Sequence, residues 1–241
     1  MKAAVPETYG LDELRFYVVE LELHSITWFS SLTQPHLEGS VQVMLPVIHN
    51  YPLTLALLGE IVEESYLSKY NEVKDARSPA ERFGETGVYA YPLLLERIYY
   101  KRVLMSMSET DYVFYKPRTR IAVPLLTSYN ALAPGTIGRT VVITRGSPLP
   151  RELYLRMGAK RYGVWKLSRA VEARPALRQD PLELNTPFNV RDVKSGDLVR
   201  YSIALKHYAG DVALAGTARK TLEFRVDRRV ELRPLPFFLS A

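Results

Sequence analysis

The sequence predicts one α+β domain with β-rich insertions, and three observations support this fold class. Residues Arg15–Leu23 are rich in β-branched and aromatic residues and have the pattern of a strand. A helical pattern starts at Asn50, and from Arg97 onward the chain consists mainly of short β-type runs separated by turn residues. No repeat of fixed period is visible, so we expect a single domain over residues 1–241.

The first strand is predicted from its alternation of residue types. Val19, Leu21 and Leu23 alternate with Glu20 and Glu22, and successive side chains of a strand point to opposite faces. We therefore expect a half-buried strand with its apolar side on a core.

The helix predicted from Asn50 is the clearest one in the sequence. Asn50 can cap it, and Pro52 is tolerated in the first turn of a helix. Apolar residues then recur at spacings of three and four residues: Leu55, Leu58, Val62 and Tyr66. Glu60, Glu63 and Glu64 lie on its polar side and would repel phosphates, so we expect this side to face solvent or a basic protein.

The second half of the chain is predicted to consist mainly of strands. Clusters of Gly, Pro, Ser and Asp separate the runs, which is typical of turns between strands. The runs are Arg97–Met107, Tyr112–Val123, Arg139–Arg145, Leu153–Leu167, Leu198–Tyr208 and Lys220–Val226.

The composition is that of a soluble globular protein, with 47% hydrophobic and 24% charged residues. The chain has no cysteine, which excludes disulfides, thiolate zinc sites, iron–sulfur clusters and cysteine nucleophiles. It has no apolar stretch long enough to span a membrane and no apolar signal-peptide core at its start, so we expect a cytoplasmic protein. Few Asn and Gln together with many Arg, Glu and Pro favour a thermophilic source.

The net charge of +6 hides a strong asymmetry along the chain. Residues 1–96 hold six basic and 14 acidic residues, a net charge of −8. Residues 97–241 hold 26 basic and 12 acidic residues, a net charge of +14. Such a positive field attracts polyanions, so nucleic acid is the first candidate partner of the second portion.

Residues 151–178 combine many cations with aromatic side chains. The cations are Arg151, Arg156, Lys160, Arg161, Lys166, Arg169, Arg174 and Arg178, and the interleaved rings are Tyr154, Tyr162 and Trp165. Guanidinium groups contact phosphates and aromatic rings stack on unpaired bases, so this mixture indicates single-stranded RNA or DNA bound along its backbone. It contains no pattern that would read particular bases.

The same segment predicts a β-hairpin over about residues 149–170 with a turn at Gly158. In its first arm Tyr154 and Arg156 point outward, opposite a buried apolar face. In its second arm either Trp165 with Arg161 and Arg169, or Tyr162 with Lys166, points outward, and the register of the hairpin decides between these two sets. The alternative is an amphipathic hairpin whose aromatic rings belong to the core.

Three strings in this sequence resemble the type I-D branch of the fifth CRISPR-associated protein family. They are Ile48–Leu53 (IHNYPL), Ser128–Asn130 (SYN) and Pro148–Arg161 (PLPRELYLRMGAKR). The resemblance spans residues 15–167. It implies a ferredoxin-like, RRM-type core with a projecting β-hairpin, in a small subunit of the multisubunit interference complex, Cascade, that serves antiviral defence.

The resemblance also implies partners. A subunit of this kind caps the 5′ handle of the CRISPR RNA (crRNA) and contacts the neighbouring backbone subunit and the large subunit; target DNA is a further candidate. In this branch a separate endoribonuclease cuts the guide, so we expect no catalytic activity. Base pairing reads sequence in guide-RNA complexes, which suits a protein without base-reading residues.

The expected RNA-binding residues combine this segment with two upstream positions. Asn130 enters through the resemblance, and Arg139 follows the glycines of Ala133–Arg139, a loop that forms either a phosphate cradle or a tight turn. The full set is Asn130, Arg139, Arg151, Tyr154, Arg156, Lys160, Arg161, Tyr162, Trp165, Lys166 and Arg169. A second aromatic and basic cluster, Tyr99–Arg102, is either an RNA contact or a charge-protected strand edge.

The histidines predict no metal site, and we expect no cofactor. The spacing of His24, His36, His49 and His207 contains no helical pair of ligands. One alternative function is a metal-independent endoribonuclease that processes repeat RNA, with His24 placed beside His207 or Lys206. The other is a structural adaptor that binds proteins without RNA contact.

Overall fold

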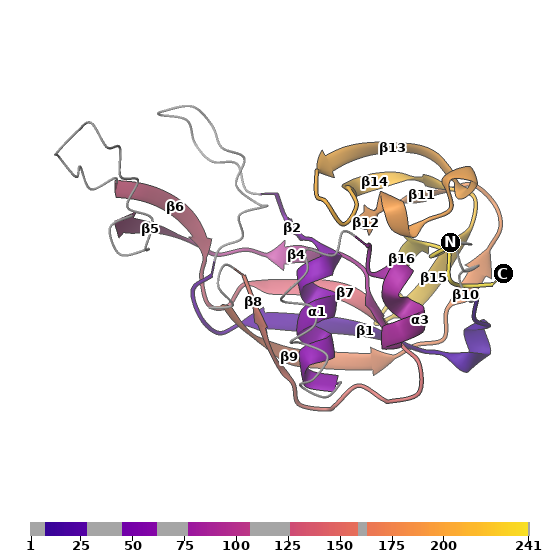
Figure 1. The fold of residues 1–241 in the computed structure, drawn as a ribbon, viewed down its shortest axis with the longest axis horizontal. Helices are drawn as coiled ribbons and strands as arrows, with labels where there is room; N and C mark the ends of the chain where they lie inside the picture. The colour runs from indigo at the N-terminus through magenta and orange to yellow at the C-terminus, as the bar shows by residue number, and fades with distance from the viewer. Residues whose placement is uncertain (1–7, 28–44, 62–76, 107–125, 159–162, 241) are drawn as a thin grey trace, which may run out of the picture.

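The structure is a computed structural model that describes residues 8–27, 45–61, 77–106, 126–158 and 163–240. It is mostly β, with a main sheet curled into a half-barrel (Figure 1). The expected α+β fold with a ferredoxin-like, RRM-type core is therefore wrong. Strands from the end of the chain, together with Ala80 and Phe83 of two short helices, cover the second face of the main sheet.

The main sheet has seven strands and is antiparallel throughout. The order along its main path is β2 (Val47–Ile48), β4 (Leu93–Arg97), β7 (Ile137–Thr144), β1 (Arg15–Leu23), β9 (Gly163–Glu172) and β8 (Tyr154–Met157). The short strand β3 (Val88–Ala90) also pairs with β7. β1, which is the predicted first strand, thus lies inside the sheet between β7 and β9.

β1 is buried on both faces in its first half. Tyr17 and Val19 pack in the core cluster on one face, whereas Phe16 and Val18 pack in the cluster on the other. Glu20 and Glu22 share the face of Phe16 and Val18 but are only half-buried. The alternation is therefore confirmed for the second half of the strand, and the first half is more buried than a half-exposed strand would be.

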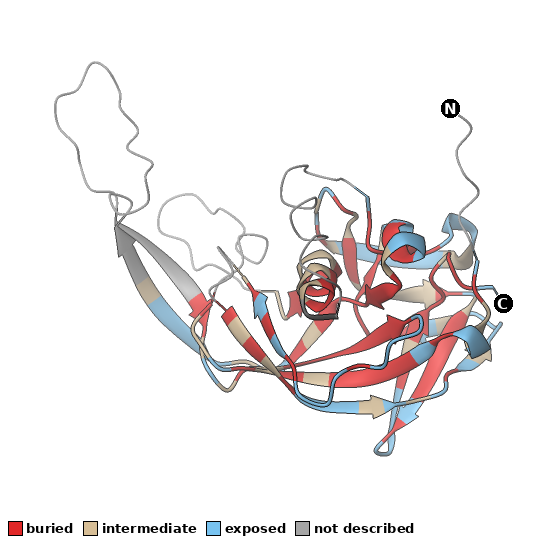
Figure 2. Cartoon of the chain, turned by 60° about the horizontal axis from the view of Figure 1, so that its bottom comes forward, coloured by how far each residue is buried: buried red, intermediate tan, exposed pale blue. Residues whose placement is uncertain are grey.

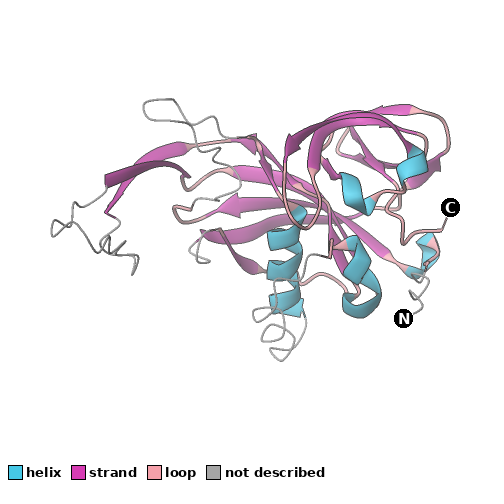
Figure 3. Cartoon of the chain, turned by 45° about the horizontal axis from the view of Figure 1, so that its top comes forward, coloured by secondary structure: helices cyan, strands magenta, loops and turns pink. Residues whose placement is uncertain are grey.

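Helix α1 (Asn50–Ile61) covers one face of the sheet (Figures 1 and 3). It starts at Asn50 as predicted. Leu53, Leu57 and Leu58 are buried against the sheet, and Leu55 packs only at the margin of that core. Val62 and Tyr66 lie outside the described residues. The short helices η1 (Leu11–Glu13), η2 (Ala80–Arg82) and α3 (Phe83–Thr86) complete the helical part before β3.

The rest of the chain forms three smaller sheets. The first contains β10 (Ala176–Arg178), β15 (Thr221–Val226) and β16 (Arg229–Pro234). The second contains β11 (Leu182–Leu184), β12 (Phe188–Asn189) and β13 (Leu198–Leu205), all paired with β14 (Val212–Ala218); η5 (Val190–Asp192) and η6 (Ser195–Asp197) precede β13. The third is the hairpin of β5 (Tyr100–Ser106) and β6 (Leu126–Leu132).

The hairpin predicted over residues 149–170 forms, but it does not project. β8 pairs with β9, and β9 pairs along β1 from Tyr17 opposite Glu172 to Leu23 opposite Trp165. The segment is therefore the edge of the main sheet. The element that extends away from the body is the β5–β6 hairpin (Figures 1 and 2). The predicted run Tyr112–Val123 lies outside the described residues.

A buried polar network joins the start of α1 to the C-terminal strands. The Asp192 carboxylate accepts hydrogen bonds from Asn50 Nδ2 at 2.7 Å, Tyr89 Oη at 3.1 Å and the Ala80 backbone at 3.4 Å. Burial raises the pKa of Asp192 to about 6, although these hydrogen bonds act in the opposite direction. The carboxylate therefore connects three separate segments.

His49 forms a second connection between the start of α1 and the C-terminal part of the chain. Its Nε2 donates to the Gly210 carbonyl at 2.8 Å, and its Nδ1 accepts from the Tyr51 backbone at 2.9 Å. Burial, with His207 beside it, lowers the pKa of His49 to about 3, so the ring is neutral at pH 7. Both ring nitrogens are occupied, which gives His49 a structural role.

The β15–β16 turn is strained, and this generates a stability prediction. Asp227 and Arg228 link paired strands with φ of 52° and 64°, a conformation that favours glycine. Arg228→Gly should raise the free energy of unfolding by about 0.5–1 kcal/mol in urea titrations, because it relieves left-handed strain. Gly146→Ala, at a φ of 91° with open space around the site, should lower it by about 1 kcal/mol. Equal signs for the two variants would contradict this account.

Candidate nucleic-acid interface

The outer face of β8 and β9 carries the exposed part of the basic, aromatic segment. Along β8, Leu155 and Met157 are buried while Tyr154 and Arg156 are exposed, as predicted. Leu155 lies opposite Trp165, and Tyr154 lies opposite Lys166. This register answers the question that the sequence leaves open: Trp165 points into the core, and Lys166 shares the outer face with Tyr154.

Tyr154 is the centre of a small group of side chains on this face. Its residue surface is 44% exposed, and Lys166 Nζ lies 5.7 Å from the centroid of its ring. The ring of His24, at the end of β1, meets the Tyr154 ring edge-on at a centroid distance of 6.3 Å. His24 Nε2 lies 3.9 Å from the Glu22 carboxylate. A flat ring next to the Lys166 ammonium group is thus open to solvent.

Arg151 and Arg156 extend this surface. Both are exposed, and neither has an ion-pair partner among the described residues. Arg156 lies two residues from Tyr154 on the same face of β8. We call the outer-face residues Tyr154, Arg156 and Lys166, together with the exposed Arg151 that precedes β8, the Tyr154 surface.

Two of the expected RNA contacts are instead engaged with carboxylates. Arg139 is buried and forms ion pairs with Glu231 and, at 3.5 Å, with Glu20. Arg169 pairs with Asp227 in the β15–β16 turn, and this hydrogen bond raises the pKa of Arg169. The burial of Arg139 in its ion pairs makes it a poor phosphate ligand, since a phosphate would have to displace a buried carboxylate. Arg169 is half-exposed, and its surface ion pair competes with a phosphate only weakly.

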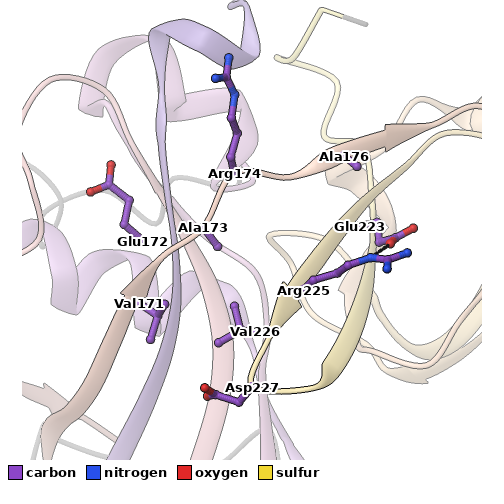
Figure 4. A pocket seen from close by; sticks show the side chains of 9 residues that line it. All are labelled: Val171, Glu172, Ala173, Arg174, Ala176, Glu223, Arg225, Val226 and Asp227. Carbon is purple, nitrogen blue, oxygen red and sulfur yellow. Dashed lines mark hydrogen bonds and ion pairs between the residues drawn. The ribbon is translucent and has the colours of Figure 1, made fainter.

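The two arginines that follow also have carboxylate partners. Arg174 pairs with Asp12, and Arg178 donates to Glu223 at 2.7 Å. In the close-up of Figure 4, Arg174 and Arg225 line a cavity of about 470 Å³ together with Glu172, Glu223 and Asp227. Arg225 also donates to Glu223. The cavity therefore mixes paired cations with carboxylates, which does not favour an anionic ligand.

The structure does not describe three further expected RNA contacts, Lys160, Arg161 and Tyr162. Asn130 lies on β6 opposite Arg102, and its side chain is outside the described part. The glycines of Ala133–Arg139 form a tight connection: Gly138 lies in β7, where a Cβ would come within 2.6 Å of Leu93. The tight turn itself is at Pro134–Gly135, where the Thr136 N–H donates to the Ala133 carbonyl at 3.2 Å.

The Tyr99–Arg102 cluster lies at the base of the projecting hairpin. Tyr99, Tyr100 and Lys101 are exposed there. Thr27 connects this base to the β8–β9 hairpin, because its backbone pairs with Leu132 and its Oγ1 donates to the Met157 carbonyl at 3.3 Å. The cluster and the Tyr154 surface therefore lie at the same end of the main sheet, which the sequence does not reveal.

The structure does not place His24 beside His207, which the endoribonuclease alternative expects. His207 packs against His49 at a ring distance of 4.1 Å, whereas His24 lies beside Tyr154. His36 is outside the described residues. Within the described ranges, no group of three His, Asp or Glu side chains could hold a metal ion. No helix of the described part is long and apolar enough to cross a membrane.

Comparison with known proteins identifies the family. The family model for the type I-D CRISPR-associated protein Cas5/Csc1 matches residues 14–221. The chain belongs to the Cas5/Csc1 family. No curated protein matches it. Among solved structures it is similar to a CRISPR protein from Archaeoglobus fulgidus, with 11% sequence identity, a TM-score of 0.37, and coverage of 92% of this chain and 100% of that one. As a Cas5/Csc1 protein it has a CRISPR-associated role.

Trp165 is an expected RNA contact that the structure places in the core. It is fully buried, packed in the core between the sheet and α1. Within the described part, its indole nitrogen has no hydrogen-bond partner. Trp165 is therefore a core residue, and the reason is its register opposite Leu155 and Leu23.

This placement gives opposite predictions for two rings of one hairpin. Trp165→Ala should lower the free energy of unfolding by about 3–5 kcal/mol, because it leaves a large cavity in the core. Tyr154→Ala should change it by less than about 1 kcal/mol, since Tyr154 lies on the surface. Thermal and urea unfolding of both variants measures this. A folding defect in Tyr154→Ala, or a stable Trp165→Ala protein, would contradict the assigned register.

Proposed function

We propose that this Cas5/Csc1 protein is a non-catalytic RNA-binding subunit of a type I-D interference complex that holds the 5′ handle of the crRNA. The observation that carries the proposal is the Tyr154 surface, where an exposed ring lies between Lys166 and Arg156. Family membership supports a place in a complex that contains crRNA.

The chemistry of this surface suits a single strand. An exposed tyrosine can stack on any base, because every base has a π-face. Arg156 and Arg151 can contact phosphates, and a guanidinium can do so with two parallel hydrogen bonds. The surface lies on strands of the main sheet, whose pairing fixes the spacing between ring and cations. The exposed Tyr99–Arg102 cluster offers the strand a continuation along the same end of the sheet.

The proposed protein partners are the neighbouring backbone subunit and the large subunit. The negative charge of residues 1–96 is only weak support for a contact with another protein. Several carboxylates of this portion are engaged by arginines of the second portion, among them Glu20 with Arg139 and Glu96 with Arg229 at 3.0 Å. Protein contact therefore has to be argued from other surfaces.

RNA binding by the Tyr154 surface should depend on salt in a defined way. Three described cations, Arg151, Arg156 and Lys166, should give a slope of log K against log salt of about −2, at about −0.7 per phosphate contact. Arg156→Ala should reduce the size of this slope by about 0.7, and Tyr154→Ala should weaken binding by about 1–3 kcal/mol. Fluorescence anisotropy with a labelled 5′-handle RNA measures both.

The matched control is Arg200→Ala, which removes an exposed arginine on β13 that pairs with Glu183 at 3.2 Å. It should leave both affinity and slope unchanged. A flat salt response of the native protein, or equal losses in Arg156→Ala and Arg200→Ala, would refute the assignment of RNA to the Tyr154 surface.

A metal-independent endoribonuclease is the second candidate, because His24, Tyr154 and Lys166 lie together. These are residue types that can exchange protons with RNA. The group lies on an open strand face, and His24 and Glu22 are each about two-fifths exposed in their side chains. General acid–base catalysis gains most where water is excluded, so this geometry favours binding over cleavage.

Incubation with labelled repeat RNA in a metal chelator distinguishes the two candidates. We expect no specific cleavage by the native protein and no difference between it and His24→Ala. Cleavage at one position that His24→Ala abolishes would establish the enzyme and overturn the non-catalytic role.

A further inference from the structure

β13 exposes a stripe of apolar side chains. Val199, Tyr201 and Ile203 alternate along the strand and are 53%, 43% and 44% exposed, respectively. Tyr208, shortly after the strand, is also exposed. Soluble proteins rarely leave several large apolar side chains together in water unless they bind something.

β13 also has a free backbone edge. It pairs with β14 on one side, and no other described strand pairs with it. It lies at the outside of its sheet in Figures 1 and 3. Proteins protect such edges with charged residues, prolines or a covering segment, because an unpaired edge accepts another strand. Arg200 is the only charged residue within β13, and Glu183 engages it.

A hollow lies over β14, between β13 and β11, on the paired side of β13. Tyr201, Arg200 and Ser202 line it on one side, and Leu184 of β11 lines it on the other, with a volume of about 280 Å³. Gly216 of β14 forms part of its floor, where a Cβ would come within 2.7 Å of the Arg200 carbonyl. The hollow therefore exposes Tyr201 from the β14 side and does not lie along the free edge.

The charges around β13 indicate what that segment contains. Lys194 precedes the strand and Lys206 follows it; both are exposed, and neither forms an ion pair with a described residue, although Asp197 and Asp211 lie near them. A second copy of the chain would bring lysines toward lysines in an antiparallel pairing centred on Arg200, which like-charge repulsion disfavours. A segment with apolar residues in its middle and acidic residues at its ends fits instead.

We infer that β13 is the docking edge for an extended, apolar segment with acidic ends from a neighbouring subunit of the interference complex. The segment adds a strand to the sheet and places its side chains against Val199, Tyr201 and Ile203. The register of β13 shifts at three places, so the added strand is short. This inference rests on the proposed role as a subunit, but it does not involve the Tyr154 surface.

Hydrogen exchange and assembly test the docking edge. The chain is coexpressed with the other subunits of its own CRISPR system and crRNA, and amide exchange is compared between the free chain and the purified complex. Amides of residues 199–203 should exchange at least tenfold more slowly in the complex. Val199→Lys should reduce recovery of the chain in the complex at least fivefold, with an unchanged melting temperature.

The matched control is Val230→Lys on β16, which changes a valine of similar exposure, 47%, outside β13. It should assemble normally. Unchanged exchange in residues 199–203, or equal recovery of the two lysine variants, would overturn the inference. A dimer of the free chain that Val199→Lys dissociates would also overturn it, because the occupant would then be a second copy.

RNA binding by the free chain separates this inference from the proposed function. Val199→Lys should bind 5′-handle RNA as the native chain does. If the native chain binds no RNA but Val199→Lys still fails to assemble, the docking edge stands and the RNA role falls. If Tyr154→Ala loses RNA while Val199→Lys assembles fully, the RNA role stands and the docking edge falls.

Discussion

The burial of β1 on both faces is the constraint on which the rest of the structure depends. One face requires α1, and the other requires β15, whose Leu222 and Phe224 pack in the same core as Phe16 and Val18. The C-terminal hairpin therefore has to return to the first strand of the chain. It covers the outer face as far as Asp227, which meets Arg169 beside the β1–β9 irregularity. Beyond that point the outer face is open, and this is where His24 and Tyr154 lie.

Ion pairs follow the same long-range packing. The sequence separates an acidic first portion from a basic second portion, and the fold brings them together: Glu20 meets Arg139, Asp12 meets Arg174, and Glu81 meets Arg191. Arg139 and Arg233 further share Glu231 in a buried group between the main sheet and β16. Folding leaves the net charge unchanged but engages many arginines. Only some of the excess cations of the second portion are therefore free to bind phosphates.

The sequence predicts correctly the features that depend on residues close together in the chain. The alternation of β1, the start of α1 at Asn50 and the outward direction of Tyr154 and Arg156 follow from spacing within a few residues. The inward direction of Trp165 depends on pairing with β1, more than 140 residues earlier. Likewise, Glu231 engages Arg139 across 92 residues. The ferredoxin-like expectation failed for the same reason, because nothing local shows that strands from the end of the chain pack on the second face.

The small number of free cations on the Tyr154 surface is consistent with a subunit that is also held by protein contacts. When two surfaces of one chain bind parts of the same assembly, the second contact forms at high effective concentration, and neither contact has to be strong alone. Tyr154 lies on the main sheet and β13 on a separate sheet, so RNA and a neighbouring subunit could be bound at the same time without competing for side chains. A few phosphate contacts and one stacked base would then be sufficient to retain the guide, and many arginines could form ion pairs within the protein instead.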